Sequence, residues 1–202
     1  MIGVAVMGYG VVGSGVVELI DQNNKIFSEK IGQDIAVKHI LDVRDFPGNK
    51  YESLITKDFN DILSDPETEI VCETIGGAKV AYDFTKRCLC AGKSVVTSNK
   101  ELVATHGTEL LAFAKEHGVD YMFEAAVGGG IPIIRPLINC LAANRIDKIV
   151  GILNGTTNYI LTKMIKEKAS FSDALKEAQR LGYAEADPSA DVDGKDTCRK
   201  IC

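Results

Sequence analysis

Three glycines near the N-terminus constrain the fold of this chain more than any other feature. Gly8, Gly10 and Gly13 stand in the hexapeptide GYGVVG, directly after the uncharged apolar run of residues 2–7. The residues that follow predict an amphipathic helix. Its apolar side is expected to carry Val12, Val16, Leu19 and Ile20. A strand, a glycine turn and a helix in this order are the context that a dinucleotide-binding turn requires.

Each glycine has its own expected role in such a turn. Gly8 permits the tight turn, Gly10 lets the backbone approach a pyrophosphate, and Gly13 allows the helix to pack close to the strand. The N–H groups at the start of the helix, at Val11 and Val12, would then face the phosphates, where the positive end of the helix dipole also lies. The alternative is a glycine-rich turn without a ligand inside an α/β core. Because strand and helix flank the motif correctly, we expect a bound dinucleotide.

Strand-like and helix-like segments alternate through the first 130 or so residues. Further strands are expected at 35–41, 70–75, 94–97 and 121–127. Helices are expected at 58–65, 81–91 and 107–118. This alternation predicts an α/β fold with a parallel, doubly wound sheet of the Rossmann type.

The pattern changes after the three consecutive glycines at 128–130. A helix is expected at 132–144, a strand at 148–153 and a loop at 154–158. Helices ending near Lys168 and Leu181 follow, and then an acidic tail that turns helical. We therefore expect an NAD(P)-binding domain over residues 1–131 and a second domain over 132–202. The helical pattern is still in progress at Cys202, so the second domain is expected to be truncated.

Charge and cysteine content exclude several classes of protein. The net charge is −5, without a basic cluster, which argues against a nucleic-acid partner. The apolar N-terminus has no basic flank and is too short to span a bilayer, so neither a signal peptide nor a membrane segment is expected. The six cysteines are scattered through apolar stretches and are expected to be reduced, which indicates a cytoplasmic protein.

The end of the second expected strand carries two charged residues that could select the cofactor. Asp42 would bind the ribose 2′-hydroxyl of NAD, whereas Arg44 would hold the 2′-phosphate of NADP. Either residue could instead be a solvated loop charge. The sequence leaves the choice between NAD and NADP open.

Six blocks of the sequence together closely resemble homoserine dehydrogenases. These blocks are GYGVVG (8–13), ETIGG (73–77), VVTSNKELVA (95–104), EAAVGGGIPIIRPL (124–137), LNGTTNYIL (153–161) and LGYAEADPSADVDGKDTCRK (181–200). The resemblance implies NAD(P)-dependent interconversion of L-homoserine and L-aspartate 4-semialdehyde, in threonine and methionine biosynthesis. It also implies a homodimer and an α+β substrate domain, which in the family continues beyond the point that corresponds to Cys202.

The same resemblance assigns site residues. Lys100 and Lys200 match lysines of the catalytic centre, with Lys200 as the acid/base, and Lys100 also matches a cofactor contact. Glu185, Asp191 and Asp196 match acids that contact the substrate, whose ammonium needs carboxylate partners. The resemblance assigns further cofactor contacts to Thr74 and Gly182, and a monovalent cation site, for Na⁺, to Glu124, Val127, Gly129 and Ile131. Without the resemblance, each lysine would be read as a surface charge, and Asp196 and Lys200 as a surface ion pair with i,i+4 spacing.

Two other functions are compatible with the sequence. The chain could hold a dinucleotide without turnover, as a catalytically incomplete module. It could also be another semialdehyde or amino-acid dehydrogenase, although the block at 181–200 argues against this. Turnover of homoserine with NADP would distinguish an enzyme from a binding module, whereas cofactor binding alone would not.

Overall fold

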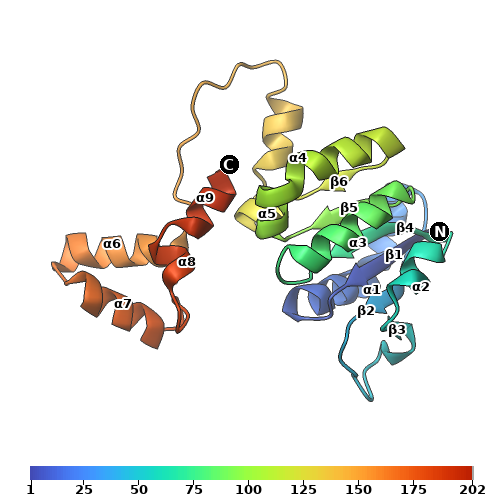
Figure 1. Cartoon of the computed structure of the whole chain (residues 1–202), viewed down its shortest axis with the longest axis horizontal. Coiled ribbons are helices and arrows are strands. Elements are labelled where there is room, and N and C mark those ends of the chain that lie inside the picture. Colours follow the sequence, from blue (N-terminus) through green and yellow to red (C-terminus); the bar gives the residue numbers. More distant parts are fainter. Residues whose placement is uncertain (202) are drawn as a thin grey trace. The chain divides into compact units, whose positions relative to one another are not determined.

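The computed structural model describes residues 1–201 and divides the chain into two compact units. The first unit covers Met1–Pro132, and the second begins at Ile133. The boundary expected from the sequence lies one residue earlier. Each unit is described by itself (Figure 1).

The first unit is built on a six-stranded sheet with the order β3-β2-β1-β4-β5-β6. The strands are β1 (Ile2–Met7), β2 (Ile35–Leu41), β3 (Ile55–Thr56), β4 (Thr68–Glu73), β5 (Ser94–Thr97) and β6 (Tyr121–Met122). Every pairing between neighbours is parallel. The strand order reverses at β1, which lies between β2 and β4, and this is where doubly wound sheets bind ligands. The predicted fold class is confirmed.

Helices cover both faces of the sheet, as Figure 1 shows. The helices of this unit are α1 (Val11–Ile31), α2 (Phe59–Ser64), α3 (Lys79–Cys90), α4 (Lys100–His117) and the single turn α5 (Ala125–Gly128). Alternate side chains of β1 point to opposite faces. Val6 packs in one buried cluster with Val17 of α1, whereas Ala5 and Met7 belong to the cluster formed with α2, α3 and α4.

The predicted apolar side of α1 is partly wrong. Its buried residues are Gly13, Val17 and Ile20, whereas Val12 and Leu19 are about half exposed, at 53% and 52%. The expectation counted apolar side chains only. Gly13, which has no side chain, is the point of closest approach, and it decides which side of the helix faces the sheet.

Two further boundaries differ from the predicted ones. Helix α4 begins seven residues early, at Lys100, because the side chain of Asn99 accepts a hydrogen bond from the N–H of Leu102 and caps the helix there. The strand expected at 121–127 is only the two-residue β6, and α5 follows it. β6 is an edge strand with β5 as its partner, and the pairing ends at Val96 and Met122.

Helices make up the regular structure of the second unit as far as residue 201. They are a π-helical turn at Pro136–Cys140, α6 (Gly155–Glu167), α7 (Phe171–Arg180), α8 (Ser189–Val192) and α9 (Lys195–Ile201). α6 and α7 pack against each other around Ile160, Ala174 and Ala178. The helix expected at 132–144 is much shorter than predicted, since the element found there is the π-helical turn at Pro136–Cys140.

The strand predicted at 148–153 does not form. Ile149, Val150 and Ile152 are 55%, 79% and 78% exposed, in a segment without regular structure. An apolar run becomes a strand only when a neighbour pairs with it, and the described part of this unit contains no other strand. The loop predicted at 154–158 is also wrong, because Asn154 caps α6 and the helix begins at Gly155.

Within residues 1–201, no helix has the length and apolar character needed to cross a membrane. The five described cysteines have free thiols, as predicted. Burial raises the pKa of Cys72 to about 11 and that of Cys88 to about 12, which keeps both thiols protonated. Cys202 lies outside the described residues.

Candidate active site

The glycine turn has the steric requirements that the sequence predicts. Gly8 has a φ of +95°, and a Cβ there would lie 2.9 Å from the carbonyl oxygen of Thr74. A Cβ on Gly13 would lie 1.8 Å from the carbonyl oxygen of Gly8. In contrast, nothing lies within 4 Å of the Cβ position of Gly10. The turn is therefore closed on the protein side and open at Gly10, where a pyrophosphate would approach the start of α1.

Thr74, the residue that follows β4, stabilises this turn. Its hydroxyl lies 3.0 Å from the carbonyl oxygen of Met7 and 2.8 Å from that of Gly8, and its N–H donates to Met7 at 2.9 Å. These contacts join the carboxyl ends of β1 and β4 across the point where the strand order reverses. Thr74 therefore has a structural role here, in addition to the cofactor contact predicted for it.

Asp42, whose side chain is buried, and Arg44, whose side chain is exposed, form an ion pair beside the glycine turn. Oδ1 of Asp42 accepts from the backbone N–H and Nε of Arg44, at 2.9 and 3.0 Å. Oδ2 accepts from the N–H of Tyr9 and from Nη2 of Arg44, at 2.8 and 2.9 Å. The Arg44 guanidinium holds the pKa of Asp42 well below its usual range. Asp42 is 7% exposed as a side chain, whereas Arg44 is 57% exposed, so the cation faces solvent.

A carboxylate has about four lone-pair positions, and the four donors to Asp42 match that number. An additional ribose hydroxyl would therefore have to displace one of them. Arg44 has five N–H donors, of which three are engaged, two by Asp42 and one by the Tyr9 carbonyl oxygen at 3.0 Å. The two on Nη1 are left for an anion.

Sequence reasoning missed Glu73, the last residue of β4. Its side chain is fully buried and accepts from the Thr97 hydroxyl at 2.5 Å and from the N–H of Ile75 at 2.7 Å. Thr97 in turn accepts from the N–H of Asn99, the residue that caps α4 just before Lys100. Burial raises the pKa of Glu73. An acidic residue in the apolar strand IVCET was the signal that could have identified it.

In the second unit, the structure brings together three of the predicted residues. Nζ of Lys200 lies 2.7 Å from Oδ2 of Asp196 and donates to the carbonyl oxygen of Leu153 at 2.9 Å. Asn154, which was not predicted, donates from Nδ2 to Asp191 at 2.7 Å and to Asp196 at 2.9 Å. Asp196 is 4% and Lys200 19% exposed as side chains. This pair is therefore part of a buried polar cluster, unlike an ordinary surface ion pair.

The remaining predicted residues lie outside that cluster. Glu185 is exposed between α7 and α8, and within residues 1–201 its carboxylate makes no hydrogen bond to Asp191, Asp196 or Lys200. Gly182, with a φ of +78°, follows α7 in the left-handed conformation that favours glycine.

The predicted cation ligands occupy one short segment of the first unit. Glu124 precedes α5, Val127 lies within it, and Gly129 follows it with a φ of +60°. Ile131 donates its N–H to the carbonyl oxygen of Gly128 at 3.0 Å and is 66% exposed. Among residues 1–201, no group of three or more His, Cys, Asp or Glu side chains could hold a metal ion.

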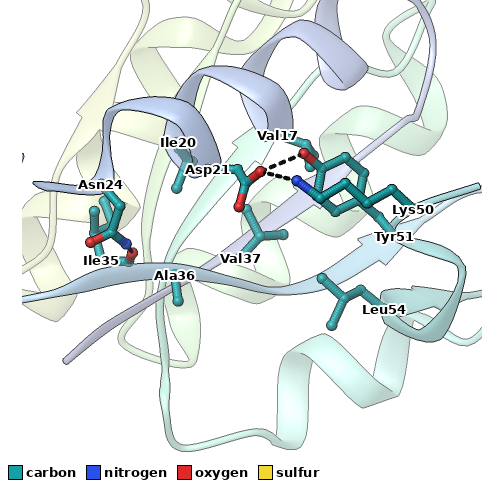
Figure 2. Close-up of a pocket in the computed structure, with 10 residues that line it drawn as sticks. All are labelled: Val17, Ile20, Asp21, Asn24, Ile35, Ala36, Val37, Lys50, Tyr51 and Leu54. Atoms are coloured by element: carbon teal, nitrogen blue, oxygen red, sulfur yellow. Dashed lines mark hydrogen bonds and ion pairs between the residues drawn. The ribbon is translucent and has the colours of Figure 1, made fainter.

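A cavity of about 290 Å³ lies elsewhere, between α1 and β2 (Figure 2). Its wall includes Ile35, Ala36 and Val37, the first residues of β2, and at its edge the Asp21 carboxylate accepts from Lys50 at 2.5 Å and from Tyr51 at 3.0 Å. Ligands of doubly wound sheets bind at the carboxyl ends of the strands. This cavity is therefore separate from the dinucleotide turn.

Comparisons with known proteins agree with both halves of this arrangement. Residues 8–124 match the family model "Homoserine dehydrogenase, NAD binding domain", and residues 132–202 match "Homoserine dehydrogenase". The chain is 46% identical over 202 residues to the homoserine dehydrogenase of Bacillus subtilis, a match that covers 98% of this chain and 46% of that protein.

Solved structures give the same result. The crystal structure of a homoserine dehydrogenase from Thiobacillus denitrificans is 43% identical, with a TM-score of 0.89, over 99% of this chain and 47% of that one. A hyperthermophilic archaeal homoserine dehydrogenase in complex with NADPH is 30% identical, with a TM-score of 0.82, over 98% of this chain and 67% of that one. The chain spans about half the length of the curated relatives it matches. The match to both family models establishes that this chain belongs to the homoserine dehydrogenase family.

Proposed function

We propose that the protein to which these 202 residues belong interconverts L-homoserine and L-aspartate 4-semialdehyde with NADP or NAD. The observation that carries this proposal is the Lys200 ammonium, held between Asp196 and the carbonyl oxygen of Leu153. An ammonium has three N–H donors, and these two partners engage two of them. Within the described residues, the third is available to a substrate oxygen.

The first unit fits a dinucleotide. Gly10 leaves open space beside the first N–H groups of α1, at Val11 and Val12. Arg44, after β2, is 57% exposed, and its hydrogen bonds to Asp42 and Tyr9 use only Nε and Nη2. These features favour NADP, since both oxygens of Asp42 are already engaged. When bound, the nicotinamide supplies the hydride acceptor or donor. Lys100, at the start of α4, and Gly182 are proposed as further contacts to the cofactor.

Lys200 acts on the proton. In the direction of homoserine formation, Nζ of Lys200 donates a proton to the aldehyde oxygen as negative charge develops there. In the reverse direction Lys200 acts in its deprotonated form: the neutral amine accepts the hydroxyl proton, while the carbon that bears this hydroxyl would give its hydride to the oxidised nicotinamide. Asp196 keeps the lysine oriented in both directions. Asp191 and Glu185 would hold the ammonium of the substrate, which requires a carboxylate partner.

The proposal has three further parts. The segment Glu124–Ile131, with Val127 and Gly129 between, is proposed to bind Na⁺ through one carboxylate and backbone carbonyls. The exposed apolar segment 148–153 supports a homodimer, because large exposed apolar surfaces mark interfaces. The free thiols support a cytoplasmic location.

The test is steady-state oxidation of L-homoserine with NADP by the protein expressed from its own gene. Lys200→Ala is expected to lower kcat by about a hundredfold or more, since loss of a general acid/base costs roughly 10²–10⁴. The Kd for NADPH, measured by calorimetry, should stay within about twofold because Lys200 acts on the reacting oxygen.

Lys163→Ala is the matched control. Lys163 has a similar side-chain exposure, 21%, and is also paired with a carboxylate at i,i+4 spacing, that of Glu167. Its loss should leave kcat near the parent value. Parent-like turnover in Lys200→Ala would remove this residue as the acid/base. Tight NADPH binding without any homoserine turnover would instead support the dinucleotide-binding module.

A further inference from the structure

We propose that Asn154 is a positioning residue, whose side-chain amide holds Asp191 and Asp196 together beside Lys200. The inference rests on the proposed function, in which Lys200 and Asp191 meet the substrate and Asp196 orients Lys200. Asn154 itself is 6% exposed and has no role in contacting the substrate in this proposal.

The amide of Asn154 is fully used and has a single orientation. Oδ1 accepts from the N–H of Thr157 at 2.8 Å and from its hydroxyl at 2.9 Å. Nδ2 donates one hydrogen to Asp191 and the other to Asp196. A rotated amide would place its N–H groups against the N–H of Thr157 and its oxygen against two carboxylates. The network therefore fixes which end of the amide faces the acids.

The two acids need such a donor. Oδ1 of Asp191 and Oδ2 of Asp196 both lie within 3 Å of the same nitrogen, so they are less than 6 Å apart. Like charges at this separation in a partly buried site repel each other. Lys200 is paired with Asp196 at 2.7 Å. Asn154 adds a hydrogen bond to each acid without adding another ionisable group.

Asn154 also acts together with the residue before it. The carbonyl oxygen of Leu153 accepts from Lys200, while the side chain of Asn154 donates to Asp196, 42 residues along the chain. Two consecutive residues therefore hold both members of the pair on α9. A helix of seven residues is too short to be stable alone, so its orientation depends on such anchors.

The helix cap does not by itself require asparagine. Serine and aspartate cap helices about equally well. Ser170 does so for α7, where its hydroxyl accepts from the N–H of Asp173 at 3.1 Å. Asparagine alone among the good caps offers an accepting oxygen together with two N–H donors. The two carboxylates therefore explain why asparagine stands at this position.

Three variants separate the cap from the donors. Asn154→Asp keeps the shape and the cap but replaces both donors by an oxygen. Asn154→Ser keeps the cap and removes the donors without adding charge. Ser170→Ala, the matched control, removes a helix cap from the same unit and leaves Asp191, Asp196 and Lys200 untouched.

For Asn154→Asp we expect kcat/KM for homoserine to fall at least about tenfold near pH 8, with the Kd for NADPH unchanged. The deficit should shrink near pH 6, because a carboxyl facing Asp191 and Asp196, with Lys200 as the nearby cation, binds a proton readily and then donates again. Asn154→Ser should show a smaller deficit that does not vary with pH. Ser170→Ala should melt at a lower temperature with parent-like kcat/KM.

Parent-like kcat/KM in Asn154→Asp near pH 8, or a deficit that does not vary with pH, would overturn the proposal. Hydrogen exchange on the protein expressed from its own gene, without substrate or cofactor, provides a readout that needs no activity. Amides of Lys195–Ile201 should exchange faster in Asn154→Asp than in Ser170→Ala, and unchanged protection of α9 would also refute the role of Asn154. If the parent protein does not oxidise homoserine, the proposed function fails, and the exchange result decides the positioning by itself.

Discussion

Replacing Arg44 by alanine should reverse the cofactor preference of the first unit. The change removes the two outward N–H donors of Nη1 and also the two side-chain hydrogen bonds that Arg44 makes to Asp42. The first loss weakens the binding of NADP, because the 2′-phosphate no longer meets a cation. The second loss strengthens the binding of NAD, because one lone pair on each oxygen of Asp42 becomes available to the ribose hydroxyls.

The structure sets the size of both effects. Charge-assisted hydrogen bonds to a phosphate are among the strong ones. However, Arg44 is 57% exposed and already neutralised by Asp42, so solvent screening reduces the effect. We expect a roughly thirtyfold increase in the Kd for NADPH. One new hydrogen bond from a ribose hydroxyl to Asp42 should lower the Kd for NADH by about fivefold.

Isothermal titration of both cofactors into the 202-residue chain measures these values. Lys50→Ala serves as the control, because Lys50 is an exposed cation of the same unit that pairs with Asp21 away from β2's carboxyl end. Lys50→Ala should change the Kd for NADPH and the Kd for NADH only by the small effect of removing one positive charge from the protein. Equal weakening of NADPH and NADH in Arg44→Ala, or no weakening, would refute the assignment of Arg44 to the 2′-phosphate.

Four other substitutions have expected outcomes. Gly10→Val should abolish NADPH binding in calorimetry with little change in melting temperature, because the Cβ position of Gly10 is open. Gly13→Ala should destabilise the fold by about 3 kcal/mol, since its Cβ would collide with the Gly8 carbonyl oxygen. A parent-like stability of Gly13→Ala would contradict this. Burial raises the pKa of Glu73, so the folded state retains a proton that the unfolded chain releases. The folded protein therefore loses stability as the pH rises through and above the usual pKa of a glutamate, near 4.5. Glu73→Gln should therefore gain melting temperature relative to the parent as the pH is raised, and a constant difference would argue against this linkage. Glu185→Ala should raise the KM for homoserine more than it lowers kcat, and an unchanged KM would remove Glu185 as a partner of the substrate ammonium.

Features that depend on residues close together in the sequence could be predicted, and these include most of the first unit. The glycine turn could be predicted because its requirements, a positive φ at Gly8 and the absence of a side chain at Gly13, concern residues within one turn of each other. Most strands and helices followed from periodicity for the same reason. The pairing of Asp196 with Lys200 was predictable as well, because i,i+4 spacing on a helix brings two side chains together wherever the helix lies.

Contacts between distant residues could not be obtained in this way. Asn154 reaches Asp196 across 42 residues, and nothing in the segment NGTTN indicates two carboxylates nearby. The run at 148–153 has the composition of a strand, but pairing depends on a neighbouring strand, which local sequence does not specify. Burial of Glu73, and the use of both oxygens of Asp42, likewise depend on how separate segments meet. The sequence by itself thus determined the fold of the first unit and the residue types of the candidate site. Tertiary packing decided which polar groups are already engaged, because hydrogen-bond partners are set by distance in space.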